Sequence, residues 1–345
     1  MMLESRSKTA PAFFHEILFE VCKMEKELEL LSAIGVVPTI EIEDAQKAVP
    51  LAKALMAGGL PVAEVTFRTS AAPESIRRIS QECPEVLIGA GTVLTCQQVD
   101  QALEAGSKFL VTPGFHPHVI RYALAKGALV IPGTATPGEM EQAMGMGLNV
   151  VKFFPAEQNG GTAALKALAG PYKQLRWLPT GGINIGNLNE YLSCAQVLAC
   201  GGSWMVKREL IQSEAWNEIT ALCKETLRTM LGFRVVHVGM NCRSADEAEH
   251  IARLFCRLFD VPYLPNETAV FAGSLVECIK GPYLGAHGHI AIGTNNVDRA
   301  VYHLEQRGVA FEEASRKTDA QGRTTLIYMK EEIGGFALHL VKNTP

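Results

Sequence analysis

The sequence predicts an α/β protein in which a (β/α)8 barrel is followed by a smaller α+β domain. Between about residues 35 and 231, eight short β-rich runs alternate with amphipathic helical stretches, a pattern typical of parallel strands with crossover helices. Eight such units in about 200 residues fit a (β/α)8 TIM barrel. From about Val235 the pattern changes, and two successive runs of a strand, a helix and further strands indicate paired βαβββ units.

The predicted elements follow from the positions of these runs. The barrel strands are expected at 36–42, 62–67, 86–88, 109–112, 129–131, 150–154, 176–178 and 197–199. Helical segments between them include 44–56, 72–81, 97–104 and 118–125, several with a glycine at the expected C-cap. In the C-terminal part, strands are expected at 235–240, near Ala269, and at 275–279, 289–292, 325–329 and 336–341, with helices at 245–259 and 297–306.

Length and composition indicate two domains and small-molecule partners. We expect an N-terminal extension over 1–23, the barrel over 24–232 and the second domain over 233–345. A net charge of only -4 without any Lys/Arg block predicts neither a nucleic-acid nor an anionic membrane partner. We see neither an export signal nor a membrane span. Nine cysteines without a Cys-x-x-Cys spacing predict a reducing cytoplasmic location.

Lys152 is the most informative residue, because it is a lone amine in an otherwise apolar predicted strand. Burial disfavours the charged form of an amine and lowers its pKa, which makes a lysine nucleophilic toward carbonyl carbon. A Schiff-base enzyme is therefore the first hypothesis. The alternative is that Lys152 is a solvated residue at a sheet edge.

A second predicted strand carries polar residues at alternate positions. In the run 62–68, Glu64, Thr66 and Arg68 share one face. Active sites of (β/α)8 barrels lie at the C-terminal ends of the strands, so a carboxylate, a guanidinium and the Lys152 amine would converge as proton shuttle, anion anchor and nucleophile. Glu64 and Arg68 could instead form a structural pair.

Paired glycines follow the last two predicted strands, in Pro179-Thr180-Gly181-Gly182 and Cys200-Gly201-Gly202-Ser203-Trp204. Barrels of this kind commonly bind phosphate there through backbone N–H groups, and the hydroxyls of Thr180 and Ser203 could add donors. Glycine pairs alone also indicate tight turns. Their position favours a phosphate site.

The barrel segment resembles the bifunctional 2-keto-3-deoxy-6-phosphogluconate (KDPG) and 4-hydroxy-2-oxoglutarate (KHG) aldolases from about residue 24 to 232. The motifs that carry the resemblance are Val65-Thr66-Phe67-Arg68-Thr69 after Glu64, Gly89-Ala90-Gly91-Thr92-Val93, Lys152-Phe153-Phe154-Pro155-Ala156-Glu157, Pro179-Thr180-Gly181-Gly182 and Gly201-Gly202-Ser203-Trp204. The resemblance implies a class I pyruvate aldolase that needs no metal or other cofactor, typically a homotrimer.

The resemblance also implies a role for each site residue. Lys152 would form an imine with the keto carbon of pyruvate, and Glu64 would move protons through a water molecule. The substrate would be held by Arg68 and Thr92 at the carboxylate, by Pro113 and Phe154 along the site, and by Thr180, Gly181, Gly182 and Ser203 at a phosphate. Departures from the family pattern at Thr112 and at 135–138 leave the substrate preference open.

Two other classes compete with the aldolase hypothesis. A metal-dependent sugar-phosphate epimerase would share the barrel and the phosphate loops, but it would need His and Asp ligands at strand ends that this barrel does not show. A noncatalytic sugar-acid binding protein would have little reason to retain Lys152, Glu64 and Arg68 together.

The C-terminal segment resembles one domain of the vicinal oxygen chelate superfamily, which includes glyoxalase I and extradiol dioxygenases. The resemblance rests on residues 236–238, 276–278, 288–291 and 337–340. It implies a metal site of His237, Glu277, His289 and His339, a ligand set that suits divalent Zn, Ni, Fe or Mn. Alternatively, these histidines are satisfied by local hydrogen bonds. His339 replaces the carboxylate usual in glyoxalase I, which argues against glyoxalase activity in particular. Two roles stay open for this domain: a second enzyme acting on a related 2-keto or aldehyde compound, and a noncatalytic binding and oligomerisation domain.

Overall fold

The computed structural model describes residues 24–343, so the predicted extension over 1–23 lies outside the described residues. The chain divides into two compact units, and the boundary along the sequence falls between Leu227 and Arg228. This division lies within helix α10 (Trp216–Leu231), a few residues before the predicted domain boundary. Within the described range, no helix is both long and apolar enough to cross a membrane.

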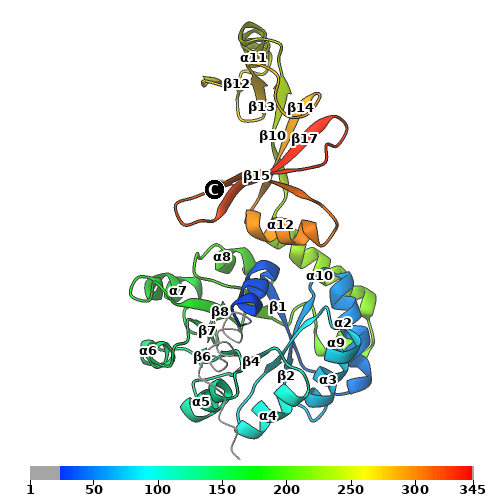
Figure 1. The fold of residues 1–345 in the computed structure, drawn as a ribbon, viewed down its shortest axis with the longest axis vertical. Coiled ribbons are helices and arrows are strands. Elements are labelled where there is room, and N and C mark those ends of the chain that lie inside the picture. The colour runs from blue at the N-terminus through cyan, green and yellow to red at the C-terminus, as the bar shows by residue number, and fades with distance from the viewer. Residues whose placement is uncertain (1–23, 344–345) are drawn as a thin grey trace, which may run out of the picture. The chain divides into compact units, whose positions relative to one another are not determined.

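The first unit is built on parallel strands that curve into a half-barrel (Figure 1). Its strands are β1 (Val36–Ile40), β2 (Val62–Thr66), β3 (Leu87–Gly91), β4 (Phe109–Val111), β5 (Val130–Ile131), β6 (Gly133–Thr134), β7 (Val150–Phe153), β8 (Arg176–Pro179) and β9 (Cys200–Gly202). They form two sheets, with the strand orders β5-β4-β3-β2-β1-β9 and β6-β7-β8. Parallel bridges join Trp177 of β8 to Val197, and Thr180 to Gly201 of β9.

Helices alternate with these strands and cover their outer side (Figure 1). A helix over residues 24–34 precedes β1. A short 3-10 helix, η1 (Ala45–Lys47), follows β1. The α-helices after it are α2 (Ala48–Ala57), α3 (Ala72–Glu82), α4 (Cys96–Glu104), α5 (Pro117–Ala125), α6 (Pro137–Gly145), α7 (Gly161–Ala169), α8 (Leu188–Leu192), α9 (Arg208–Gln212) and α10. Local sequence explains where several begin. The Thr95 hydroxyl accepts from the Gln98 amide at the start of α4, and Thr136 and Glu139 form a capping box before α6.

The predicted position of the last barrel strand was wrong. The structure places β9 at Cys200–Gly202 rather than at 197–199, and Val197 makes only an isolated bridge. In β9, Gly201 and Gly202 pair with Val37 and Pro38 of β1. Glycine has low strand propensity, but a Cβ on Gly201 would lie 2.4 Å from the Thr180 hydroxyl oxygen, so this strand needs glycine for room.

The interior of the first unit is almost entirely apolar. All residues of β2, β3 and β7 are buried, and the largest enclosed side chains include Trp177, Phe109 and Phe153. Among the described residues of this unit, Glu64 and Lys152 are the only buried carboxylate and amine. Because burying an unpaired charge is costly, these two side chains mark where the fold departs from a purely apolar core.

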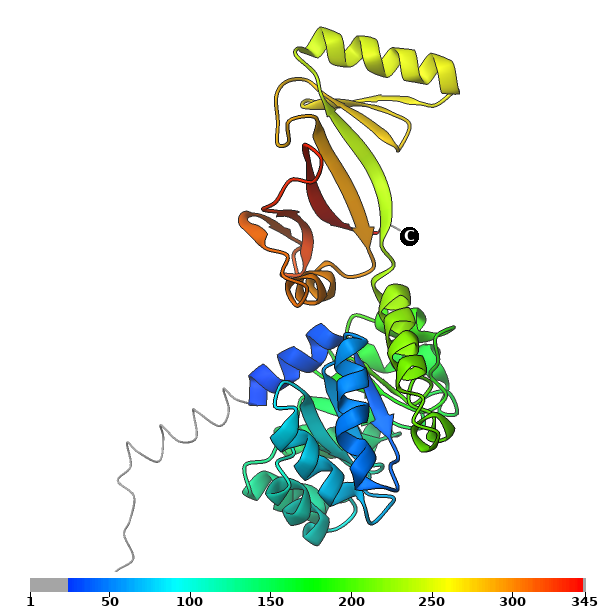
Figure 2. The ribbon, with the colours of Figure 1, turned by 90° about the vertical axis from the view of Figure 1, so that its right-hand side faces the viewer.

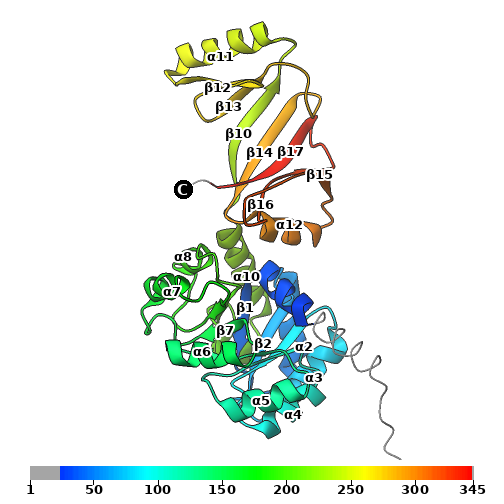
Figure 3. The same ribbon diagram turned by 60° about the vertical axis from the view of Figure 1, so that its left-hand side comes forward.

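The second unit is a mixed sheet of eight strands with two helices (Figures 2 and 3). Its elements in chain order are β10 (Arg234–Asn241), α11 (Ala245–Phe259), β11 (Tyr263–Pro265), β12 (Ala269–Ala272), β13 (Val276–Ile279), β14 (Gly288–Thr294), α12 (Val297–Glu305), β15 (Phe311–Thr318), β16 (Thr324–Met329) and β17 (Phe336–Lys342). The chain thus passes twice through strand, helix and three strands. The sheet order is β11-β12-β13-β10-β14-β17-β16-β15, and the antiparallel β10–β14 pair joins the two halves.

Replacing Gly89 by Ala should destabilise the first unit. An added Cβ would lie 2.2 Å from the ring of the buried Phe109, and such overpacking costs about 2 kcal/mol. Urea unfolding followed by tryptophan fluorescence measures this unit alone, because Trp177, Trp204 and Trp216 all lie before Arg228. As a control, Ala at Gly145 in α6 meets nothing within 4 Å and should not destabilise. Equal midpoints for Gly89→Ala and the wild type would contradict the packing argument.

Candidate functional site

Lys152 and Glu64 meet in the interior of the first unit. The Nζ of Lys152, in β7, donates a hydrogen bond to Oε1 of Glu64, in β2, over 3.3 Å. The relative exposures are 5% for Lys152 and 0% for Glu64. The two strands belong to different sheets, so the contact joins side chains from the two sheets of the first unit. A buried amine and a buried carboxylate are therefore in direct contact, as a nucleophile and a proton carrier need to be.

A glycine in the neighbouring strand makes room for the Glu64 carboxylate. A Cβ on Gly91 of β3 would lie 2.2 Å from Glu64 Oε1, so no other residue fits there without moving the carboxylate. The other oxygen, Oε2, is buried and has no hydrogen-bond partner among the described residues. Buried polar atoms are rarely left unpaired, so Oε2 is available to a proton-bearing ligand or water molecule.

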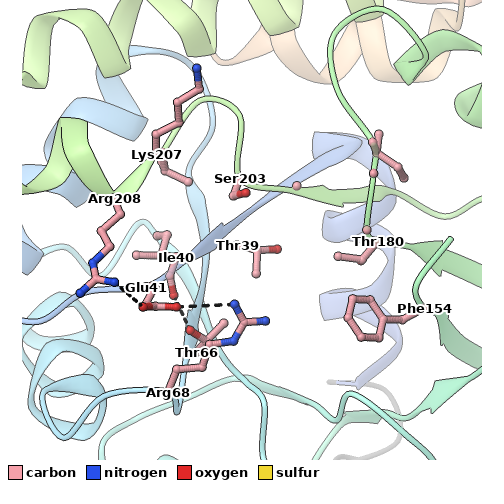
Figure 4. Close-up of a pocket in the computed structure, with 15 residues that line it drawn as sticks. Thr39, Ile40, Glu41, Thr66, Arg68, Phe154, Thr180, Ser203, Lys207 and Arg208 are labelled. Carbon is pink, nitrogen blue, oxygen red and sulfur yellow. Dashed lines mark hydrogen bonds and ion pairs between the residues drawn. The ribbon is translucent and has the colours of Figure 1, made fainter. Parts of the chain in front are cut away.

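A pocket of about 370 Å³ lies close to this pair in the chain, and Figure 4 shows the residues that line it; Lys152 and Glu64 themselves are not among them. Thr66 lines the pocket, and strand alternation puts Thr66 on the same face of β2 as Glu64. Phe154, the residue directly after β7, lines it as well. Lys152 Nζ lies 5.2 Å from the centre of the Phe154 ring. The remaining lining residues are Thr39, Ile40, Glu41, Arg68, Thr180, Gly181, Gly182, Ile183, Gly202, Ser203, Val206, Lys207 and Arg208.

The glycine pair after β8 forms one wall of the pocket. Gly181 and Gly182 have φ values of +97° and +80°, which residues with side chains rarely adopt. Thr180 Oγ1 is buried without a partner among the described residues, and Ser203, Lys207 and Arg208 line the same pocket. Hydroxyls and cations gathered around an exposed turn of backbone suit an anion such as phosphate.

Arg68 reaches the pocket but is shared with a carboxylate that the sequence analysis did not single out. Glu41 Oε2 lies 3.6 Å from Arg68 Nη1, and Glu41 Oε1 lies 3.7 Å from Arg208 Nη1 (Figure 4). Both guanidiniums are about half exposed. The alternation that identifies Glu64 also groups Thr39 and Glu41 on one face of the first strand, so this signal was present in the sequence.

Two predicted substrate-binding residues, Thr92 and Pro113, are not among the residues that line this pocket. Thr92 follows β3 with φ of +56°, and Pro113 follows β4. The backbone carbon of Pro113 would lie 2.3 Å from a Cβ at Gly133, the first residue of β6, so the chain after β4 runs close against β6. Both residues lie at strand ends, and their contacts with substrate stay predictions.

The second unit brings three of its four predicted ligands, His237, His289 and His339, into one group, and Glu277 contacts two of them. His237 Nε2 lies 3.0 Å from His289 Nε2, and Glu277 Oε2 lies 3.3 and 3.1 Å from these two nitrogens. Ligand atoms of His237, His289 and His339 all fall within 4.8 Å of one another. A Cβ on Gly239 would lie 2.2 Å from the His289 ring, so again a glycine provides the space.

Burial and mutual contact shift the pKa values in this cluster. Burial raises the pKa of Glu277, but hydrogen bonds from His237 and His289 outweigh it and lower the pKa to about 2. Burial, with the charges of His289 and His237, lowers the pKa of His339 to about 3. Tyr328 stacks on the His339 ring with centres 4.7 Å apart. At neutral pH the cluster thus contains a carboxylate and a neutral imidazole, the forms that bind metal ions.

Residues 28–222 match a protein-family model described as KDPG and KHG aldolase. A 2-dehydro-3-deoxy-phosphogluconate aldolase of Treponema pallidum is 50% identical over 200 residues, which cover 58% of this chain and 95% of that relative. The KHG/KDPG aldolase of Escherichia coli K12 is 44% identical over 198 residues, covering 57% of this chain and 93% of the relative.

Two solved structures are also similar to the first unit. The KDPG aldolase of Legionella pneumophila, solved with pyruvate captured at low pH as a covalent carbinolamine intermediate, is 40% identical with a TM-score of 0.56 and covers 58% of this chain and 97% of its own. The corresponding aldolase of Zymomonas mobilis ZM4, solved with 3-phosphoglycerate, is 42% identical with a TM-score of 0.55 and covers 58% and 94%.

Replacing Glu64 by Gln should lower the free energy of unfolding of the first unit by about 3 kcal/mol, because the buried Lys152 amine loses its counter-charge. The double variant Glu64→Gln/Lys152→Met removes both charges and should lose clearly less than the two single variants added together. Urea unfolding followed by tryptophan fluorescence gives all three values. Strict additivity would mean that the two side chains are not coupled.

Proposed function

Because the chain belongs to the family of KDPG and KHG aldolases, we propose that its first unit cleaves 2-keto-4-hydroxy acids by class I Schiff-base chemistry. The substrates are KDPG, which yields pyruvate and glyceraldehyde 3-phosphate, and KHG, which yields pyruvate and glyoxylate. The observation that carries the proposal is the buried Lys152–Glu64 contact beside a pocket that can hold an anion. We further propose that the two sheets of the first unit, together with the isolated bridges at β8 and β9, form a closed (β/α)8 barrel.

Lys152 supplies the nucleophile. Its neutral amine adds to the keto carbon of the substrate to give a carbinolamine, which loses water to become a protonated imine. The contact with Glu64 supplies a carboxylate that can take up the proton the amine must lose. A carbinolamine formed with pyruvate is the species captured in the Legionella relative.

The protonated imine then acts as the electron sink, without a metal ion. When the hydroxyl on carbon four loses its proton, the bond between carbons three and four breaks, the aldehyde leaves, and the electron pair forms an enamine with the imine nitrogen. Protonation at carbon three and hydrolysis release pyruvate and free Lys152. Glu64 Oε2, buried and unpaired among the described residues, is available to accept and return these protons through a water molecule.

The other pocket residues would hold the two ends of the substrate. We propose that Arg68 and Thr92 bind the carboxylate beside the keto group, with Pro113 and Phe154 along the chain. The distal phosphate would bind at the wall of Thr180, Gly181, Gly182 and Ser203. The Zymomonas relative was solved with a phosphorylated acid, which is consistent with a phosphate subsite in the family. The homotrimer and the cytoplasmic location stay predictions.

The aldolase proposal predicts a covalent adduct that can be trapped. Incubation with pyruvate and sodium borohydride should reduce the imine, and peptide mass spectrometry should find the adduct on the Lys152 peptide. Lys152→Arg keeps a cation but forms no imine, so it should give no adduct, whereas Lys126→Arg, at an exposed lysine, should behave as the wild type. A wild-type protein without an adduct would overturn the proposed nucleophile.

A second candidate function belongs to the second unit. We propose that His237, Glu277, His289 and His339 bind one divalent metal ion, as the resemblance to the vicinal oxygen chelate superfamily implies. Two nitrogens each about 2.1 Å from a common ion, at neighbouring octahedral positions, lie about 3 Å apart, close to the His237–His289 distance. Both ring nitrogens of His339 are buried without partners among the described residues, so an ion would supply one.

The metal proposal is tested by elemental analysis of the purified protein. We expect about one equivalent of a transition metal per chain, retained through gel filtration, and its loss in the His237→Ala/His289→Ala double variant. His287→Ala serves as the control, because this exposed histidine lies in the same unit outside the cluster. Metal-free wild-type protein that also fails to take up Zn, Ni, Fe or Mn on dialysis would exclude the site.

A further inference from the structure

Three buried polar atoms around the pocket lack a hydrogen-bond partner among the described residues. They are Glu64 Oε2, Thr180 Oγ1 and Thr39 Oγ1. Unpaired atoms of this kind are uncommon in folded proteins and often mark a place where a ligand completes the hydrogen bonding. The first two already have roles in the proposed reaction. Thr39, near the end of β1, has none.

Strand register places Thr39 beside Glu64. The two residues are partners in the parallel ladder between β1 and β2, and partners in neighbouring strands point to the same face about 4.8 Å apart. Thr39 also lines the pocket, and Figure 4 shows its hydroxyl directed toward the side where Thr180 and Phe154 lie. Thr39 therefore faces the pocket at the level of the proton-carrying carboxylate.

The two unpaired atoms differ in what they can do. Glu64 Oε2, in a carboxylate that pairs with the Lys152 amine, can only accept a hydrogen bond, whereas the Thr39 hydroxyl can donate one. A single group that satisfies both must donate to Oε2 and accept from Thr39. An alcohol does this, but a keto oxygen or a carboxylate cannot, because neither carries a proton to donate.

We propose that Thr39 binds the hydroxyl on carbon four of the substrate and turns its proton toward Glu64. This inference rests on the proposed aldolase function. When the carbon three to carbon four bond breaks, the hydroxyl proton passes to Glu64, directly or through one water molecule, and the bonding electrons move to the imine nitrogen. Carbon four becomes the aldehyde carbonyl, whose oxygen still accepts the Thr39 hydrogen bond. Thr39 thus stabilises the oxygen on which negative charge develops.

The role separates Thr39 from the residues that handle pyruvate. Pyruvate has no hydroxyl on a fourth carbon, so imine formation between pyruvate and Lys152 does not use Thr39. Cleavage of the full substrate does use it. A structural defect around Lys152 and Glu64 would instead impair both reactions.

The test compares Thr39→Val, which keeps the shape but removes the hydroxyl, with Thr39→Ser, which keeps the hydroxyl. For Thr39→Val we expect kcat/KM for KDPG cleavage to fall about tenfold, mainly in kcat, because the hydrogen bond is strongest in the transition state. Thr39→Ser should stay within about threefold of the wild type. Borohydride trapping of pyruvate on Lys152 should proceed at the wild-type rate in both variants.

Each result bears on a different claim. Unchanged cleavage in Thr39→Val would overturn the role of Thr39, and so would an equal loss of cleavage and trapping, which indicates a damaged site. A loss in Thr39→Val that Thr39→Ser does not restore would also overturn it. If wild-type protein itself traps no pyruvate, the proposed aldolase function fails, and the Thr39 inference fails with it.

Discussion

The contact between Lys152 and Glu64 is the constraint on which the rest of the first unit depends. Each charge alone would be costly in an interior this apolar, so each residue offsets the cost of burying the other. The fold has to bring β2 and β7 within reach of one another, although the two strands belong to different sheets. The pocket follows from the same arrangement, because Thr66 at the end of β2 and Phe154 just after β7 both line it.

Much of this site could be predicted from local pattern. A polar residue in a buried strand stands out against apolar neighbours, and alternation then gives its face, which is how Glu64 and Lys152 were identified. The same test applied to the first strand would have identified Thr39 and Glu41. What no pattern could supply was the contact of Glu41 with Arg208, because it joins side chains far apart in sequence whose distance depends on how the loops close.

The strands that were missed fail the pattern for physical reasons. The sequence of β15 is Phe-Glu-Glu-Ala-Ser-Arg-Lys-Thr, and most of it is exposed at the edge of its sheet, where no buried face imposes an apolar period. Strand β9 was displaced because its glycines give no strand signal. The helix over Ala245–Phe259 was predicted with its bounds as observed, because one apolar stripe and a serine N-cap mark it clearly.

In both units an ionisable side chain occupies space left by a glycine in the adjoining strand: Gly91 for Glu64 and Gly239 for His289. The chemistry of each site therefore depends on a position that carries no functional group. If substitutions in such a protein are ranked by the reactivity of the residue that changes, those at these glycines would be scored as harmless. Their effect on function should instead resemble loss of the ionisable residue itself, with the chemical group still present in the sequence.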